Sequence, residues 1–126
     1  MLKLLVIGLG GSVGAITRYG LSGLAARYFQ DHFPWGTLLV NGLGCLGIGA
    51  MMSLVEHRQL FSSELRLFLS IGFLGSLTTF STMGYETLEL LRDGNFRLAI
   101  GNVTANCFLG LGAVAVGWFA VKPISV

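Results

Sequence analysis

Charge is scarce in this sequence. Only 11% of the 126 residues are Asp, Glu, Lys or Arg, against roughly 25% in an average soluble domain. The net charge is +2 and the basic residues are scattered singly, so the chain lacks the basic patch that nucleic acid requires. The length allows one domain, residues 1–126, because single domains commonly run about 100 to 200 residues. A multidomain enzyme is therefore excluded, and no nucleic-acid partner is expected.

Cysteine and proline are also rare. Cys45 and Cys107 lie alone in apolar stretches without metal-site or redox spacing, which favours buried thiols over a disulfide or a zinc site. Pro34 precedes the second apolar run and Pro123 follows the fourth, where a helix breaker does least harm. The chain also pairs no nucleophile with a nearby base. No catalytic residue is expected, and the protein is not predicted to be an enzyme.

The sequence instead has four long runs without charge, at residues 4–17, 32–55, 67–85 and 98–121. A helix needs about 20 apolar residues to cross a hydrocarbon core of about 30 Å. The first run is short, but it continues past Arg18 to Ala26 and spans the membrane if Arg18 is sheltered from lipid. We do not interpret it as a removable signal peptide. The pattern predicts an all-α membrane protein with four transmembrane helices.

The charges at the ends of the predicted spans hardly favour one orientation of the chain in the membrane over the other. Orientation normally follows the number of Lys and Arg residues near the span ends. One side carries four such residues and the other three: Lys3, Arg58, Arg66 and Lys122 against Arg27, Arg92 and Arg97. A chain with so little bias is expected to insert both ways up. Two copies inserted in opposite directions could then associate, so we predict an antiparallel homodimer.

Glycine is abundant, with 19 residues. Gly10 and Gly14 form a small-xxx-small pair, and further glycines crowd the second and fourth runs, a pattern that packs membrane helices closely. The same first run is similar to a strand entering a dinucleotide-binding loop. However, the third glycine of G-x-G-x-x-G falls at Val13, and no alternation of strands and amphipathic helices follows. A soluble nucleotide-binding protein is the weakest interpretation.

Polar residues inside the runs are the most informative, because lipid penalises them. Arg18 either extends to the interface or stands at an aqueous vestibule that attracts anions. Thr37 and Asn41 are four residues apart and share a helix face, and Asn102 and Asn106 repeat that spacing. Each of these residues either forms an interhelical hydrogen bond that holds the bundle together or lines a polar path.

The third run is harder to explain by packing alone. Residues 72–84 contain three glycines and five hydroxyl residues, so a break in the helix is expected near Gly75 to Thr79. Non-helical backbone at that depth is tolerated only inside protein or along a water-filled cavity. It offers carbonyl groups to cations and N–H groups to anions. The pattern therefore indicates an ion pathway, with Glu86 at the end of the run at an interface or a pore mouth.

Three segments together resemble the Fluc (CrcB) family of small fluoride channels: residues 11–19 (GSVGAITRY), 36–41 (GTLLVN) and 72–82 (GFLGSLTTFST), followed by Glu86. The resemblance implies passive fluoride export through the inner (plasma) membrane of a microbial cell. It also implies a dual-topology, antiparallel homodimer of identical subunits with two fluoride pathways. A structural sodium ion at the dimer centre would be held by backbone carbonyls of Gly75 and Thr78 from both subunits.

The resemblance also implies residues of the fluoride pathway. Asn41 would donate to fluoride, Phe80 would offer its ring edge, and Arg18 would lie at the mouth. Other positions implied are Thr37, Thr79, Ser81 and Thr82 as polar lining, Glu86 near a pore mouth and Asn106 on the fourth helix. Such groups suit fluoride, because a pore must replace hydration without trapping the ion by a full counter-charge, and an aromatic ring has a positive edge.

Two positions depart from the family pattern. Met83 stands where a second phenylalanine is usual, three residues after the first, and a thioether is a poorer partner for an anion. Conduction is expected to survive with an altered rate or occupancy. Gly110, one turn beyond Asn106, supplies no side-chain donor where a hydroxyl is expected.

Two other functions are compatible with a small four-helix membrane protein. A dual-topology drug or cation exporter needs a membrane-embedded carboxylate in its first span, whereas this first span holds Arg18 and no acid. A non-conducting membrane scaffold protein would leave the polar third run unexplained. Fluoride efflux from liposomes separates these possibilities.

Overall fold

The computed structural model describes residues 1–121, so Lys122 and Pro123 lie outside the described residues. Its elements are, in order, α1 (Leu2–Tyr28), α2 (Trp35–Arg58), α3 (Ser63–Arg66), the π-helical η1 (Leu67–Leu74), α4 (Gly75–Leu77), α5 (Phe80–Arg92) and α6 (Phe96–Val121). The elements α3 to α5 follow one another as a single stretch, Ser63–Arg92. Four stretches of the described chain are long and apolar enough to cross a membrane, which confirms the all-helical, four-span prediction.

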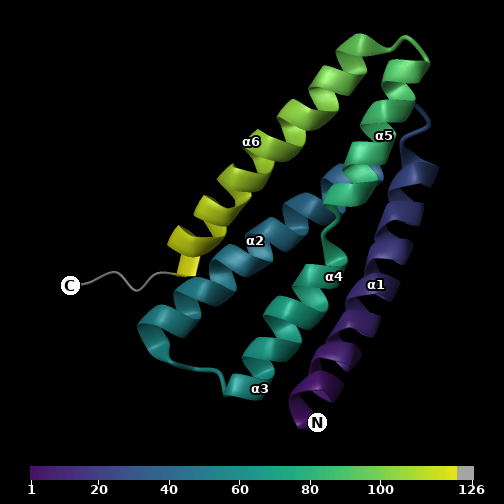
Figure 1. The fold of residues 1–126 in the computed structure, drawn as a ribbon. Helices are drawn as coiled ribbons and strands as arrows, with labels where there is room; N and C mark the ends of the chain where they lie inside the picture. The colour runs from purple at the N-terminus through teal and green to yellow at the C-terminus, as the bar shows by residue number, and fades with distance from the viewer. Residues whose placement is uncertain (122–126) are drawn as a thin grey trace.

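The spans run up and down beside one another (Figure 1). The amino terminus, the α2–α3 connection and the end of α6 lie at one end of the molecule. The α1–α2 and α5–α6 connections lie at the other end. Helices α2 and α6 pack along each other, and α1 packs against η1 and α4. The third span thus lies between α1 and α2 in its first half and beside α6 in its second half.

Local hydrogen bonds shape the α2–α3 and α5–α6 connections. The Ser62 hydroxyl accepts a hydrogen bond from the Leu65 N–H at 3.2 Å and begins α3, a common role for serine. At the end of α5, Gly94 has a φ of +77°, a left-handed conformation that favours glycine. The following Asn95 N–H then reaches the Leu90 carbonyl at 2.8 Å. The chain reverses here in the space of a few residues.

Glycines permit the closest helix contacts. A Cβ atom at Gly14 would collide with the backbone carbonyl of Phe73 in η1. On the α2–α6 contact, a Cβ at Gly49 would meet the carbonyl of Val114, and a Cβ at Gly117 would meet that of Leu46. Helices in lipid gain stability from such close backbone packing. The predicted packing role of the glycines is confirmed at these positions.

The buried core is small and contains polar residues. The largest fully buried side chains are Val40, Asn102 and Ser53. Large apolar side chains point outward instead, including Phe108 and Leu111, which are each 73% exposed. A soluble protein rarely leaves so much contiguous apolar surface in water. The outward apolar surface and inward polar groups fit a chain whose solvent is lipid.

Two residues between α4 and α5 have extended backbone. Thr78 has φ −80° and ψ 153°, and Thr79 has φ −150° and ψ 110°. Figure 1 shows this link as a short uncoiled segment between the two helices. The Thr78 N–H still donates to the Leu74 carbonyl at 3.1 Å, and the Thr79 hydroxyl accepts from the Thr82 N–H at 3.1 Å. One of these hydrogen bonds therefore closes the end of α4, and the other caps the beginning of α5.

Candidate ion pathway

The side chain of Asn41, on α2, binds the extended link directly. Its Oδ1 accepts a hydrogen bond from the Thr79 N–H at 2.7 Å, and its Nδ2 donates to the Thr79 carbonyl at 3.2 Å. In a continuous α-helix the Thr79 N–H would donate to the carbonyl of Gly75, four residues back. The amide of Asn41 thus takes the place of a neighbouring peptide group. This pairing compensates for the helical hydrogen bond that the extended link gives up.

A chain of amides extends from Asn41 across α6 to α5. Asn41 Nδ2 donates to Asn106 Oδ1 at 2.8 Å. Asn106 Nδ2 donates to Asn102 Oδ1 at 3.0 Å and to the Asn102 carbonyl at 2.9 Å. Asn102 Nδ2 donates to Thr87 Oγ1 at 3.0 Å and to the Met83 carbonyl at 3.4 Å. Three helices are therefore joined by one polar network.

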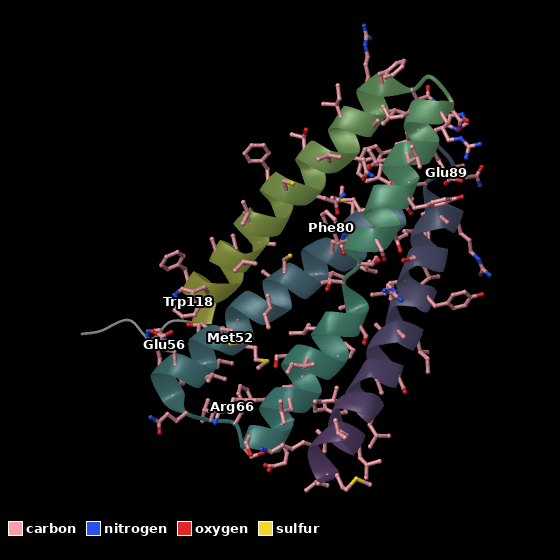
Figure 2. All side chains as sticks on the ribbon, viewed as in Figure 1. Met52, Glu56, Arg66, Phe80, Glu89 and Trp118 are labelled. Carbon is pink, nitrogen blue, oxygen red and sulfur yellow. The ribbon has the colours of Figure 1, made fainter. Side chains whose placement is uncertain are left out.

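A cluster of hydroxyl groups surrounds the start of α5. Thr79 Oγ1 donates to Thr82 Oγ1 at 2.8 Å and lies 3.4 Å from Ser81 Oγ. Ser81 and Thr82 are exposed in the described chain. Phe80, labelled in Figure 2 near the α4–α5 link, has 81% of its surface exposed. Hydroxyl groups and an aromatic side chain are thus exposed together at the start of α5.

A groove with a volume of about 370 Å³ brings many of these residues together. It is lined by Asn41, Gly44, Cys45, Ile48, Ser70, Leu74, Gly75, Thr78, Thr79, Phe80, Met83, Asn106 and Cys107. Its wall is mainly apolar, and the polar groups in it are amides, hydroxyls and thiols rather than charges. Such a wall offers hydrogen bonds to an ion without binding it through a full opposite charge.

The cysteine prediction needs a correction. Both thiols are free, but Cys45 is only half-buried and Cys107 is exposed. The prediction of a buried thiol is therefore wrong for Cys107. The reason is physical: apolar side chains of a membrane helix face outward as readily as inward, so apolar surroundings in the sequence do not indicate burial.

Thr37 and Glu86 form a second polar contact toward the α1–α2 connection. Thr37 Oγ1 donates to Glu86 Oε1 at 2.7 Å, and Glu86 Oε2 is buried without a hydrogen-bond partner in the described chain. The two side chains line a second groove of about 460 Å³. Glu86 also borders a small groove of about 210 Å³ that contains Glu89 and Asp93; Figure 2 labels Glu89 near the end of α5. Three carboxyl groups therefore border this small groove.

The structure thus gathers most of the predicted site residues in two grooves. The 370 Å³ groove holds Asn41, Gly75, Thr78, Thr79, Phe80, Met83 and Asn106, while Thr37 and Glu86 line the second groove. Ser81 and Thr82 lie in the exposed first turn of α5. Arg18 is half-buried on α1, and the linings of these grooves do not include it.

Sequence reasoning missed Thr87 and left the role of Asn102 open. Asn102 is completely buried, and both side chains complete the amide chain. The four-residue spacing of Asn102 and Asn106 places them on one helix face. This spacing was the sign in the sequence that Asn102 contacts Asn106. No pattern in the sequence indicates Thr87, because its partner comes from a different helix.

These features define a multi-pass membrane protein with a mainly apolar groove that contains amide and hydroxyl groups but no charges. The chain matches, over residues 5–118, the family described as "CrcB-like protein, Camphor Resistance (CrcB)". A protein of Salinibacter ruber named "Fluoride-specific ion channel FluC" is 50% identical over 117 residues, which cover 93% of this chain and 87% of that protein. Proteins with the same name from Chloroflexus aurantiacus and Dehalococcoides mccartyi are 44% identical over 124 residues and 42% identical over 115 residues. These alignments cover 94% and 91% of this chain, and 98% and 88% of the relatives. The chain belongs to the CrcB family.

Proposed function

We propose that this protein is a fluoride channel that lets fluoride leave the cell passively across the inner membrane. The observation that carries the proposal is the similarity, at 42% to 50% identity over more than nine-tenths of the chain, to proteins named fluoride-specific ion channels. The uncharged groove around Asn41 and Thr79 supports the same function. A channel needs ion binding that reverses readily, so amide and hydroxyl donors suit it better than a buried cation.

The extended link at Thr78 and Thr79 would lie inside the membrane, since it falls within the third apolar span. Both amide hydrogens of Asn41 already have acceptors, at 3.2 Å on the Thr79 carbonyl and 2.8 Å on Asn106. Fluoride at Asn41 must therefore displace one of them, and the longer, weaker bond to Thr79 is the one expected to yield. The hydroxyls of Ser81 and Thr82 and the edge of Phe80 then complete the ion's surroundings.

The carbonyls of Gly75 and Thr78 fit the proposed sodium site in kind. The N–H that would bond the Gly75 carbonyl in a helix belongs to Thr79 and donates to Asn41 instead. Thr78 is itself extended, so its carbonyl also points outside a regular helix. Carbonyl oxygens are suitable ligands for a hard cation, and two copies of the chain would supply four of them. Replacing sodium by a bulky organic cation during reconstitution is expected to weaken the dimer.

The open groove supports an antiparallel homodimer. Phe80 is 81% exposed and Gly75 is exposed, so the proposed ion and sodium groups stand at the surface of a single subunit. A second copy of opposite orientation would cover them and give two equivalent pathways. The weak charge bias between the ends of the spans is compatible with insertion in both directions.

Fluoride efflux from proteoliposomes tests the function. Vesicles loaded with equal fluoride and chloride are diluted into an impermeant anion, and each halide is followed with its own electrode. Fluoride release with chloride retained is expected, with no requirement for a proton gradient. Release that needs a proton gradient would favour an exporter. No release from correctly folded dimers would favour a non-conducting scaffold and contradict the proposal.

A further inference from the structure

Asn102 occupies an unusual position for a polar side chain. It is completely buried and lies on α6, one turn before Asn106. Its Oδ1 accepts from Asn106, while its Nδ2 donates to Thr87 Oγ1 and to the Met83 carbonyl. Every hydrogen-bonding atom of the side chain therefore has a partner. A buried amide without these partners would destabilise the protein.

The amide chain has a defined direction. At one end the Thr79 N–H donates to Asn41 Oδ1, so Asn41 must present its Nδ2 to Asn106. At the other end the Met83 carbonyl accepts from Asn102, so Asn102 must present its Oδ1 to Asn106. Main-chain groups cannot exchange donor and acceptor roles. The orientation of each amide is thus set by backbone at the two ends of the chain.

Asn106 is the link between these ends. Its Nδ2 hydrogens are both directed to Asn102, one to the side chain and one to the carbonyl, which leaves its Oδ1 for Asn41. If Asn102 lost its Oδ1, one hydrogen of the half-buried Asn106 amide would lose its acceptor. Rotation of the Asn106 amide would then set two donors, its own Nδ2 and that of Asn41, against each other.

We propose that Asn102 is a positioning residue of the fluoride pathway, which acts through Asn106 to hold the donor group of Asn41 in place. This inference rests on the proposed fluoride channel. Asn102 does not line the groove and does not touch the ion. Through the Met83 carbonyl and Thr87 it also ties the groove wall on α6 to the turn of α5 that follows Phe80.

The test replaces Asn102 by Leu, which has a similar shape and no hydrogen-bonding groups. The half-saturating fluoride concentration is expected to rise by roughly tenfold, the effect of losing one hydrogen bond between buried groups. A second pair of variants probes the far end of the chain. Thr87→Val keeps the shape of the side chain but removes the hydroxyl that accepts from Asn102, so fluoride affinity should fall. Thr87→Ser keeps the hydroxyl and should retain the original fluoride affinity.

Thr104→Val is the matched control on the same helix. The Thr104 hydroxyl is exposed and, within the described chain, donates to the Ile100 carbonyl of its own helix at 2.6 Å. Its loss removes a hydroxyl without touching the amide chain. Dimer content and melting temperature are measured for all variants, so that loss of folding is separated from loss of positioning.

A spectroscopic readout follows the amide of Asn41 itself. The chain has four asparagines, so asparagine-selective nitrogen-15 labelling gives four pairs of side-chain amide signals, one pair for each NH₂ group, that single substitutions assign. In the unchanged protein, fluoride is expected to shift the Asn41 signal. In Asn102→Leu the starting position of that signal should differ, and the fluoride response should need higher concentrations. A purely structural role would change the melting temperature alone.

The outcomes separate the two proposals. If the unchanged protein neither releases fluoride nor shows a fluoride-dependent Asn41 signal, the proposed function fails. If it does both, and Asn102→Leu keeps the original half-saturating concentration and the original Asn41 signal, the positioning role of Asn102 is overturned while the channel function stands.

Discussion

Asn41 and Thr79 are joined by two hydrogen bonds, from the Thr79 N–H to Asn41 Oδ1 at 2.7 Å and from Asn41 Nδ2 to the Thr79 carbonyl at 3.2 Å. The Asn41 side chain on α2 thus completes the backbone hydrogen bonding of the third span at its extended link. The arrangement stabilises the link and places an amide donor in the groove. One residue therefore serves the fold and the candidate pathway together.

Asn41→Leu is expected to lower both stability and fluoride efflux. The substitution leaves the N–H of Thr79 without its acceptor in a partly buried position, at a cost of about 1 to 3 kcal/mol. Efflux should fall by at least roughly tenfold, because the proposed donor is gone. Denaturation in detergent and the electrode assay measure the two effects. Full efflux with reduced stability would remove Asn41 from the pathway.

Thr79→Val should weaken the start of α5. Its hydroxyl accepts the Thr82 N–H at 3.1 Å, and loss of such a cap costs about 1 kcal/mol. Thr79→Ser keeps the cap and serves as the control. Hydrogen exchange at the Thr82 amide is the measurement: faster exchange in the valine variant alone is expected. Equal exchange in both variants would argue against the cap.

Thr37→Val tests the contact with Glu86. The variant keeps the shape of the side chain but removes the donor to Glu86 Oε1. The other carboxyl oxygen, Oε2, already has no hydrogen-bond partner among residues 1–121. A carboxylate released toward the groove repels fluoride, and about 1 kcal/mol of repulsion corresponds to roughly a fivefold fall in efflux. Thr37→Ser retains the hydroxyl and should conduct normally. An unchanged rate in Thr37→Val would show that the contact has no effect on the ion.

Met83→Phe introduces the second phenylalanine that the resemblance to the family implies at this position. Met83 is only 6% exposed, so the larger ring should overpack its site at a cost of about 1 to 3 kcal/mol and alter the fluoride rate. Met52→Phe, at a position 41% exposed on α2, is the matched control and should change neither. Unchanged flux and unchanged ion positions in Met83→Phe would refute the expected influence of Met83.

Gly14→Ala should separate α1 from η1. The added Cβ meets the Phe73 carbonyl, and relief requires a backbone shift costing about 1 to 3 kcal/mol. Gly8→Ala, on the same helix, has no neighbour within 4 Å and should be neutral or stabilising by up to about 1 kcal/mol through helix propensity. Melting temperatures of the two variants provide the comparison. Equal destabilisation would show that helix contact at Gly14 is not the cause.

The sequence by itself determined the spans, because crossing a bilayer requires a long apolar run and this requirement is local. It also identified Asn41 and the hydroxyl-rich segment around Thr79 as candidates for the site, since polar groups are costly in lipid, whereas Phe80 was implied only by the resemblance to the family. The close contacts at Gly14 and Gly117 were expected from glycine spacing, and the structure shows them. Each of these inferences depends on neighbours in sequence or on a single helix face.

Only the tertiary structure decided which polar groups meet. The bonds between Asn41 and Thr79, between Thr37 and Glu86, and from Asn102 to α5 join residues 15 to 49 positions apart. The exposure of Cys107 and the buried, fully bonded state of Asn102 also depend on how helices pack. Side-chain hydrogen bonds are directional and short-ranged, so their partners follow from helix rotation and depth, which composition and periodicity do not fix.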